Sequence, residues 1–238
     1  MKVNILALGA HPDDVELACG GTLAKHAAKG LKTAIVDLTQ GELGTRGNAA
    51  TRKKEALDAA KILKLNARLN LGLKDGFIQC DEKSKLSVIK CIRLFQPDVL
   101  LINAPSDRHP DHGNAAKLCS EAAFLSGLMK IKTVYKGKSQ KAWRPPAVYH
   151  YIQDQHIEPD FVVDISDFME QRMKAIKAYK SQFVSTQSKE PETYISSQAF
   201  MDSLSARPME FGRRSGVKFA EGFLAQRYIG VKLLSDLF

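Results

Sequence analysis

Apolar and polar positions alternate along the first part of the chain in a way that predicts strands separated by amphipathic helices. Residues 3–9 form a short apolar run and residues 33–38 are rich in β-branched side chains, so both are expected to be strands. Residues 17–29 lie between them with helical periodicity, and residues 51–64 form a second helix with apolar side chains on one face. Its other face is expected to hold Arg52, Lys53, Lys54, Asp58 and Lys61.

The same alternation continues through the middle of the chain. Residues 67–71 are a short third strand, residues 82–95 a helix that Pro97 ends, residues 98–103 a fully buried strand and residues 115–128 another helix. Strands joined by helices of this length are typical of a parallel sheet. The pattern therefore predicts an α/β fold: a Rossmann-like, doubly wound, mostly parallel sheet with helices on both faces. If the strand order is 3-2-1-4-5, the first and fourth strands are neighbours.

The second half of the chain is less regular. A basic loop, two strands, a helix and a long polar loop are expected there, at residues 129–146, 147–152, 161–165, 167–179 and 181–193. The chain has no linker rich in Gly or Ser and no internal repeat. We therefore expect residues 1–238 to form a single domain with a C-terminal elaboration.

Composition narrows the class of protein. The 238 residues are 44% hydrophobic and 26% charged, which is enough for a buried core and excludes a disordered tail or a minimal disulfide scaffold. No apolar run approaches the roughly 18 residues of a membrane span, and the N-terminal run is a first strand rather than a signal peptide, so we expect a cytoplasmic protein. Cys19, Cys80, Cys91 and Cys119 include no C-x-x-C pair, and free thiols are expected.

The positive net charge of the chain raises the question of which anionic partner it binds. The net charge of +9 should attract an anion, which could be nucleic acid, an anionic membrane or a small acidic metabolite. Six of the positive charges lie in the predicted loop 129–146, so the charge supports a small anionic substrate only weakly. These six are Lys130, Lys132, Lys136, Lys138, Lys141 and Arg144.

Reactive side chains gather at the ends of two predicted strands. The first strand is followed by A-H-P-D-D-V-E, which contains His11, Asp13, Asp14 and Glu16. In an open doubly wound sheet, ligands bind beyond the carboxyl ends of the strands, where the strand order reverses. The strand at 98–103 is followed by N-A-P-S-D-R-H-P-D-H, with Asp107, Arg108, His109, Asp111 and His112.

Two imidazoles and one carboxylate, with a fourth position left for water, make a catalytic zinc site. His11 and Asp14 can converge on one ion, and a histidine of the second cluster can complete the set. His112 is a better candidate than His109, because it heads the following helix. The same donors also bind non-haem iron, so Zn²⁺ and Fe²⁺ both remain open. Asp13 would then lie beside the metal as a general base, and His109 could protonate a leaving amine or steady an oxyanion.

These segments admit other interpretations. Either H-P-D segment could be an ordinary turn into a helix, although two at matching positions are hard to explain that way. Gly41, Gly44 and Gly47 form neither a Walker loop nor a dinucleotide fingerprint. A basic nucleic-acid-binding protein with a structural metal would need a binding motif that the sequence lacks. An iron-dependent oxygenase or hydratase using the same donors is a third possibility.

The pairing of A-H-P-D-D with H-P-D-H resembles the LmbE/PIG-L-like family of zinc-dependent N-deacetylases. G-E-L-G-T-R-G at 41–47, D-R-H-P-D-H at 107–112, Y-H-Y-I-Q-D at 149–154 and A-E-G-F at 220–223 are similar to the branch that makes bacillithiol. The resemblance covers nearly the whole chain. It implies removal of the acetyl group from N-acetylglucosaminyl malate or another N-acetylated glucoside, with no nucleic-acid or membrane partner, by a homo-oligomer.

The resemblance also implies roles for individual residues. The metal ligands are His11, Asp14 and His112, and the base is Asp13. The resemblance implies that His109 polarises or protonates the reacting group of the substrate.

Substrate contacts are less fixed by the motifs. Arg46 and Arg108 are candidates for holding substrate carboxylates, since a guanidinium matches a carboxylate bidentately, although either could be a structural salt-bridge partner. Tyr194 could reach over the site as a lid residue and bind the acetyl oxygen, or could be a surface residue. The family motif has an acid directly after its second Asp, whereas this chain has Val15 and then Glu16, which leaves the role of Glu16 open.

Overall fold

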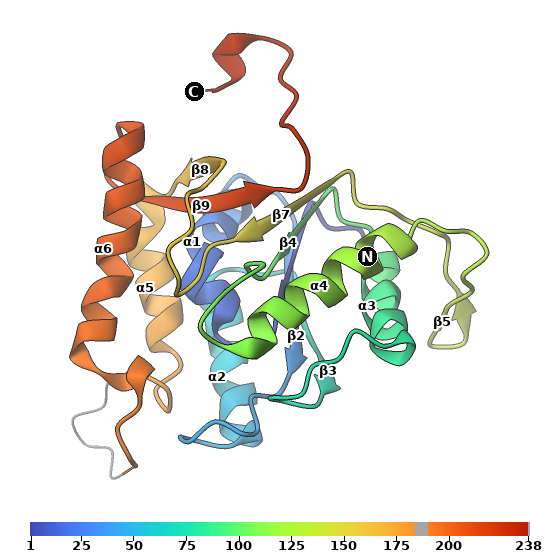
Figure 1. Cartoon of the computed structure of the whole chain (residues 1–238), viewed down its shortest axis with the longest axis horizontal. Helices are drawn as coiled ribbons and strands as arrows, with labels where there is room; N and C mark the ends of the chain where they lie inside the picture. Colours follow the sequence, from blue (N-terminus) through green and yellow to red (C-terminus); the bar gives the residue numbers. More distant parts are fainter. Residues whose placement is uncertain (184–189, 238) are drawn as a thin grey trace.

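A seven-stranded sheet organises the molecule, in the order β3-β2-β1-β4-β7-β9-β8 (Figure 1). The structure is a computed structural model that describes residues 1–183 and 190–237. Five of its strands are parallel: β1 (Ile5–Gly9), β2 (Thr33–Thr39), β3 (Ala67–Leu73), β4 (Val99–Ile102) and β7 (Ala147–Tyr151). These are the first five strands that the sequence predicts, and their order in the sheet is 3-2-1-4-5.

Two antiparallel strands extend the sheet beyond β7. Strand β9 (Ala220–Ala225) pairs with β7, and β8 (Phe161–Asp164) pairs with β9 at the edge. The sequence pattern predicted β8 but missed β9. Glu221 and Gly222 interrupt the apolar run of β9, although Ala220 and Phe223 are buried in the core.

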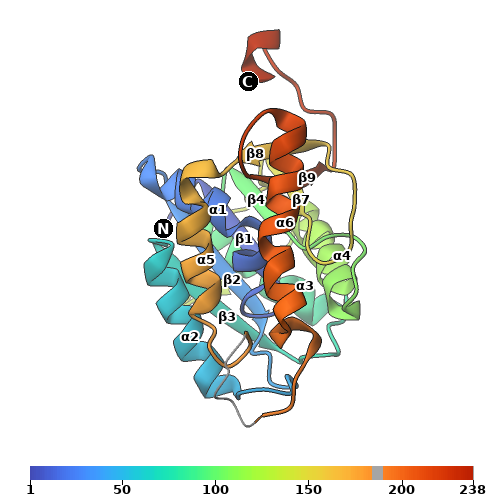
Figure 2. The same cartoon turned by 90° about the vertical axis from the view of Figure 1, so that its left-hand side faces the viewer.

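Helices cover both faces of the sheet (Figure 2). Helices α3 (Glu82–Phe95) and α4 (Pro110–Leu125) lie on one face, and α1 (Asp14–Ala28), α2 (Ala49–Ile62) and α5 (Met169–Lys177) lie on the other. Strand β1 supplies both layers, since Leu6 packs in the first core and Ala7 in the second. Successive strand residues point to opposite faces, so a strand buried on both faces reads as a continuous apolar run.

The C-terminal elaboration contains a helix that the sequence pattern did not predict. Helix α6 (Gln198–Ser215) lies beside α5 and packs on β9 (Figure 2). Pro208 and Gly212 lie within it and weaken its helical signal. Among the described residues, no helix is long and apolar enough to cross a membrane.

Smaller elements complete the chain. The basic loop 129–146 contains a hairpin of β5 (Val134–Tyr135) and β6 (Lys138–Ser139). Three 3-10 turns are η1 (Ser166–Phe168), η2 (Tyr194–Ser196) and η3 (Leu234–Leu237). Of the predicted polar loop 181–193, residues 184–189 lie outside the described residues.

The helices after both H-P-D motifs begin earlier than predicted. Helix α1 begins at Asp14 rather than residue 17, and α4 begins at Pro110 rather than residue 115. The His109 imidazole caps α4 by accepting the backbone N–H of Asp111, and Pro110 occupies the first turn. The turn interpretation of this motif is therefore correct, and the same turn positions the side chains for which the sequence analysis expects a chemical role.

A buried charge network lies behind the first turn of α1. The Arg68 guanidinium binds both oxygens of Asp37 at 2.7 and 2.8 Å and also pairs with Glu16. Glu16 accepts a further hydrogen bond of 3.0 Å from the Tyr179 hydroxyl. Glu16 is fully buried, so the acid that departs from the family motif has a structural position behind the site.

Replacing Arg68 with methionine is expected to lower the free energy of unfolding by about 3–5 kcal/mol, because it leaves two buried carboxylates without their counterion. Urea denaturation followed by circular dichroism measures the change. Lys61→Met removes the exposed ion pair with Asp58 and serves as the control, with no resolvable shift of the midpoint expected. Equal midpoints for Arg68→Met and the parent protein would contradict the role of this network.

Candidate metal centre and active site

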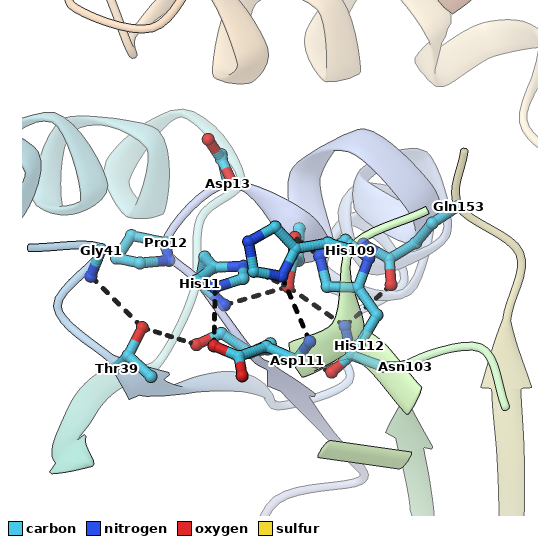
Figure 3. A network of polar contacts seen from close by, with 12 residues as sticks. His11, Pro12, Asp13, Thr39, Gly41, Asn103, His109, Asp111, His112 and Gln153 are labelled. Carbon is cyan, nitrogen blue, oxygen red and sulfur yellow. Dashed lines mark hydrogen bonds and ion pairs between the residues drawn. The ribbon is translucent and has the colours of Figure 1, made fainter. Parts of the chain in front are cut away.

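The two H-P-D segments meet at the carboxyl ends of β1 and β4, which are neighbours in the sheet. Figure 3 shows the imidazoles of His11, His109 and His112 side by side. The His11 ring centroid lies 4.6 Å from that of His109 and 5.4 Å from that of His112. The placement predicted from strand order is therefore the one observed.

Asp14 lies between two of these histidines. His112 Nε2 is 3.2 Å from Asp14 Oδ1, and His11 Nδ1 is 3.7 Å from Asp14 Oδ2. Ligands bound to one zinc ion at about 2.1 Å in a tetrahedron lie about 3.4 Å from each other. Both nitrogen–oxygen distances are close to this value, and they involve different oxygens of the Asp14 carboxylate. The backbone N–H of His11 and the Asn103 amide donate to Asp14 Oδ2 and hold the carboxylate in place.

The other ring nitrogen of each histidine is held by a carboxylate. His112 Nδ1 is 2.5 Å from Asp107 Oδ2. His11 Nε2 is 3.0 Å from Asp75 Oδ1 and 3.3 Å from Asp111 Oδ2. Metal-bound histidines almost always use their second nitrogen in this way, so both rings are oriented as ligands.

Sequence reasoning missed Asp75. It follows the end of β3 in the segment K-D-G, and the carboxyl end of a third parallel strand was the available signal. Among the described residues, two sets of donors have ligand atoms that all lie within 4.8 Å of one another, and neither includes Asp14: His11 with His109 and His112, and His11 with Asp75 and Asp111.

The electrostatics of the cluster favour a cation. Burial lowers the pKa of both imidazoles, but Asp14 and Asp107 raise the pKa of His112 to about 9. Hydrogen bonds to Asp111 and Asp14 raise the pKa of His11 well above its usual range. Burial opposes ionisation of Asp14, yet the two histidines hold its pKa well below the usual value. A site that draws positive charge onto its own ligands offers the negative potential that a metal ion needs.

Asp13 lies between His11 and Asp14 in the chain and has a strained backbone conformation. Its φ angle of 114° lies in the left-handed region, which is uncommon for a residue with a side chain and often marks functional sites. Arg52 Nη2 donates to Asp13 Oδ2 at 2.8 Å and also to the Pro12 carbonyl. Burial raises the pKa of Asp13 more than Arg52 lowers it, to about 7.

The position of Arg52 corrects the sequence analysis. Arg52 was expected on the solvent-facing side of its helix, but it is buried and reaches the Asp13 carboxylate. The helix begins at Ala49, so Arg52 lies in its first turn, next to the end of β1. Gly41 makes room for it, because a Cβ at this position, where φ is +65°, would collide with the guanidinium.

Comparison with known proteins identifies the family. The protein-family model described as "PIG-L: GlcNAc-PI de-N-acetylase" matches residues 6–123 of the chain. This range includes both H-P-D motifs. The chain belongs to the LmbE/PIG-L-like family. It is an N-deacetylase, a hydrolase of amide C–N bonds.

Relatives of this deacetylase align over most of its length. Diacetylchitobiose deacetylase of Thermococcus kodakarensis is 27% identical over 231 residues, which is 92% of this chain and 81% of that protein. "Probable N-acetyl-alpha-D-glucosaminyl L-malate deacetylase 2" of Bacillus subtilis is 26% identical over 197 residues, with 76% and 84% covered. The crystal structure of the conserved protein TT1542 from Thermus thermophilus superposes with a TM-score of 0.86 and 34% identity, covering 97% of this chain and 98% of that chain.

His109 in the deacetylase is held as a neutral hydrogen-bond donor. Its Nδ1 accepts the backbone N–H of Asp111 at 3.2 Å, which assigns the ring proton to Nε2. Burial and the positive charges of His11 and His112 lower the pKa of His109. The neutral ring with Nε2–H therefore predominates at neutral pH.

A cavity of about 380 Å³ opens on the histidine cluster, and the deacetylase places Arg46 and Arg108 in its wall. Arg46 is buried, with its Nε 3.7 Å from Glu190 Oε2. Arg108 donates to Asp154 Oδ2 at 2.9 Å and lies over the Tyr194 ring at 4.5 Å.

Tyr194 stands at the rim of this cavity rather than against the histidines. It is 55% exposed, and its hydroxyl donates to Asp154 Oδ1 at 3.1 Å. Asp154 therefore joins Arg108 and Tyr194 in one rim cluster. Arg207 also belongs to it through a hydrogen bond to the Asp154 carbonyl. Sequence reasoning missed Arg207, because the helix that presents it was not predicted.

Proposed function

We propose that this deacetylase removes the acetyl group from an N-acetylglucosamine conjugate with Zn²⁺ as cofactor, and that its substrate is N-acetylglucosaminyl malate in bacillithiol biosynthesis. The observation that supports the chemistry is Asp14 between two oriented imidazoles, with the buried Asp13 carboxylate next to it in the chain. The similarity to the malate deacetylase of Bacillus subtilis supports the substrate.

We assign the metal to His11, Asp14 and His112, because the Asp14 carboxylate lies 3.7 and 3.2 Å from one nitrogen of each imidazole, and Fe²⁺ could use the same donors. A divalent cation held there would polarise the amide carbonyl and acidify water. Asp107 fixes the ring of His112, and Asp75 and Asp111 fix the ring of His11.

Asp13 acts as the general base in this proposal. Arg52 holds its Oδ2, which leaves Oδ1 to accept the proton of the attacking water and later return it to the leaving nitrogen. A base with a pKa of about 7 suits proton transfer near neutral pH.

His109 stabilises the developing oxyanion as a hydrogen-bond donor. Because Nδ1 is used by the helix cap, Nε2–H is the atom that reaches the reacting carbonyl oxygen. The neutral His109 imidazole thus takes the polarising role, which is one of the two roles that the family resemblance implies for this residue.

The substrate's anionic group is assigned to the arginines of the cavity wall. Arg46 is buried and Arg108 is exposed at the rim, so the first supplies a desolvated charge and the second a solvated one. Tyr194 positions Arg108 through ring contact and through Asp154, and closes the rim over a bound sugar.

The proposed function is tested by amine release from three compounds: N-acetylglucosaminyl malate, methyl N-acetylglucosaminide and diacetylchitobiose. We expect the highest kcat/KM for the malate conjugate. Arg46→Met should raise KM for this conjugate about ten- to hundredfold, because a charge-assisted hydrogen bond is lost, and should change KM for the methyl glycoside little. Arg213→Met on the outer surface is the control. Preference for diacetylchitobiose would instead assign the enzyme to another N-acetylated glucoside.

We also propose that residues 1–238 act as one domain in the cytoplasm. The four cysteines are all free, as is usual in a reducing compartment.

The C-terminal arm supports a homo-oligomer. This arm, residues 226–237, leaves the body of the molecule after β9 (Figure 1). The exposed fractions of Tyr228, Leu233 and Leu234 in it are 102%, 65% and 80%. Apolar side chains in such an arm need a surface to cover them, and a second copy of the chain supplies one. We expect Leu233→Ser with Leu234→Ser to lower the mass measured by light scattering, whereas Leu57→Ser, an exposed change on α2, should not. An unchanged mass in the arm variant would contradict this assembly route.

A further inference from the structure

The active-site cavity has two chemically different sides. One side is polar and includes Arg46, Arg108 and Asp154. The other side is mainly apolar and is built from helices α1 and α6, strand β9 and the residue that follows β7, with the buried Arg172–Glu221 ion pair also in its wall. Its lining side chains are Leu17, Ala18, Ile152, Phe200, Leu204 and Phe211.

Helix α1 places the apolar side directly next to the metal donors. Asp14, Leu17 and Ala18 are spaced i, i+3 and i+4, so they share one face of the helix. All three line the cavity. A group bound at the Asp14 carboxylate therefore has Leu17 and Ala18 as its neighbours one turn along the helix.

Helix α6 forms the opposite apolar wall. Phe200, Leu204 and Phe211 fall on one stripe of this helix, and all three are buried although they line the cavity. Arg172 ties the two walls together, since it donates to the carbonyls of Leu17 and Leu204. The spacing of the walls is thus fixed by a buried side chain.

The floor of the apolar side is narrow and well packed. A Cβ at Gly222 would lie 2.8 Å from the Phe211 ring and 3.2 Å from Ile152. Glycine at this position of β9 therefore lets the Phe211 ring pack closely against the strand. The result is an apolar slot rather than a flat hydrophobic surface.

The proposed substrate has one part for each side. A sugar needs hydrogen-bond partners for its hydroxyl groups, which the arginines and Asp154 offer. An acyl group needs apolar neighbours. A single methyl group would contact only a small part of a slot that Leu17, Ala18 and the α6 stripe together form.

We propose that this slot accepts N-acyl groups longer than acetyl, so that the enzyme also hydrolyses N-propionyl and N-butyryl glucosamine conjugates. The inference rests on the proposed deacetylase function of the same site. In each case water adds its oxygen to the acyl carbon, the amide C–N bond breaks, and the nitrogen leaves with a proton as the amine. The products are a short-chain carboxylate and the free glucosamine conjugate.

The test is amine release from one glucosamine conjugate with acetyl, propionyl, butyryl and hexanoyl groups. Each methylene that becomes buried in the slot can raise binding about fourfold, so butyryl kcat/KM should be at least one tenth of the acetyl value. A butyryl value below one tenth overturns the inference while acetyl hydrolysis upholds the proposed function. Loss of activity on every compound, acetyl included, would reject both.

Two substitutions of opposite size locate the acyl chain. Leu204→Trp should lower the butyryl-to-acetyl ratio of kcat/KM at least tenfold by filling the slot, and Leu204→Ala should raise the hexanoyl-to-acetyl ratio by lengthening it. Met209→Trp, on the exposed side of the same helix, should leave both ratios unchanged. If the Leu204 variants alter the preference for the aglycone and not for the acyl chain, the slot binds the aglycone and the inference is wrong.

Discussion

Asp13→Asn is expected to lower kcat by about a hundred- to ten-thousandfold while the purified protein keeps its metal. The asparagine amide has the shape of the carboxylate but cannot accept the proton of the attacking water. Asparagine also tolerates a positive φ, so the 114° backbone angle of this position survives the change. Amine release measures kcat, and elemental analysis of the same sample measures metal content.

Asp58→Asn provides the control, because it removes an exposed carboxylate that pairs only with Lys61 in the described contacts. It should change neither quantity. Comparable turnover by Asp13→Asn and the parent protein would remove Asp13 from the role of base. Loss of metal from Asp13→Asn would instead make Asp13 a ligand.

His112→Ala is expected to lose both the metal and the activity. The variant removes one of the two imidazoles that face Asp14, and loss of a ligand should weaken metal binding more than the roughly ten- to hundredfold typical of changing a ligand's supporting partner. Competition with a chelator, followed by elemental analysis, measures the affinity. His156→Ala, which removes an exposed imidazole, is the matched control.

His109→Gln separates the possible donor sets. His11, His109 and His112 lie close enough to bind one ion, but the assignment to Asp14 predicts that His109→Gln retains the metal and loses turnover. Loss of metal from this variant together with its retention by Asp14→Asn would favour the three-histidine set.

The meeting of His11, Asp14 and His112 could be predicted from one motif and from the strand order. His11 and Asp14 belong to one turn, and the strand order brings His112 to the same edge of the sheet. Parallel β1 and β4 are buried on both faces, which gave clear apolar runs.

Arg52 could not be predicted in the same way, and Asp75 was missed although it follows the carboxyl end of a parallel strand. Arg52 reaches Asp13 because Gly41 leaves space for its guanidinium, and this depends on a loop path rather than on periodicity. Asp75 reaches His11 from the end of β3. Each of these ion pairs joins two segments that are distant in the chain, and the sequence pattern does not indicate that they lie close together.

Helix α6 and strand β9 escaped prediction for a different reason. Pro208 lies inside the helix, and Glu221 lies in a buried strand. Tertiary contacts offset the penalty of burying Glu221, which accepts hydrogen bonds from the backbone N–H groups of Gly21 and Thr22 and pairs with Arg172. Local preference yields to such contacts.

The buried contacts of Arg68 also bear on how this sequence can change over time. In the interior, Arg68 of β3 is the counterion of both Asp37 of β2 and Glu16 of α1. Losing one member leaves uncompensated charge, but exchanging all three for well-packed apolar side chains can be neutral or stabilising. Among related sequences these positions should therefore be inherited or replaced together, and a chain with only one of them altered should be rare.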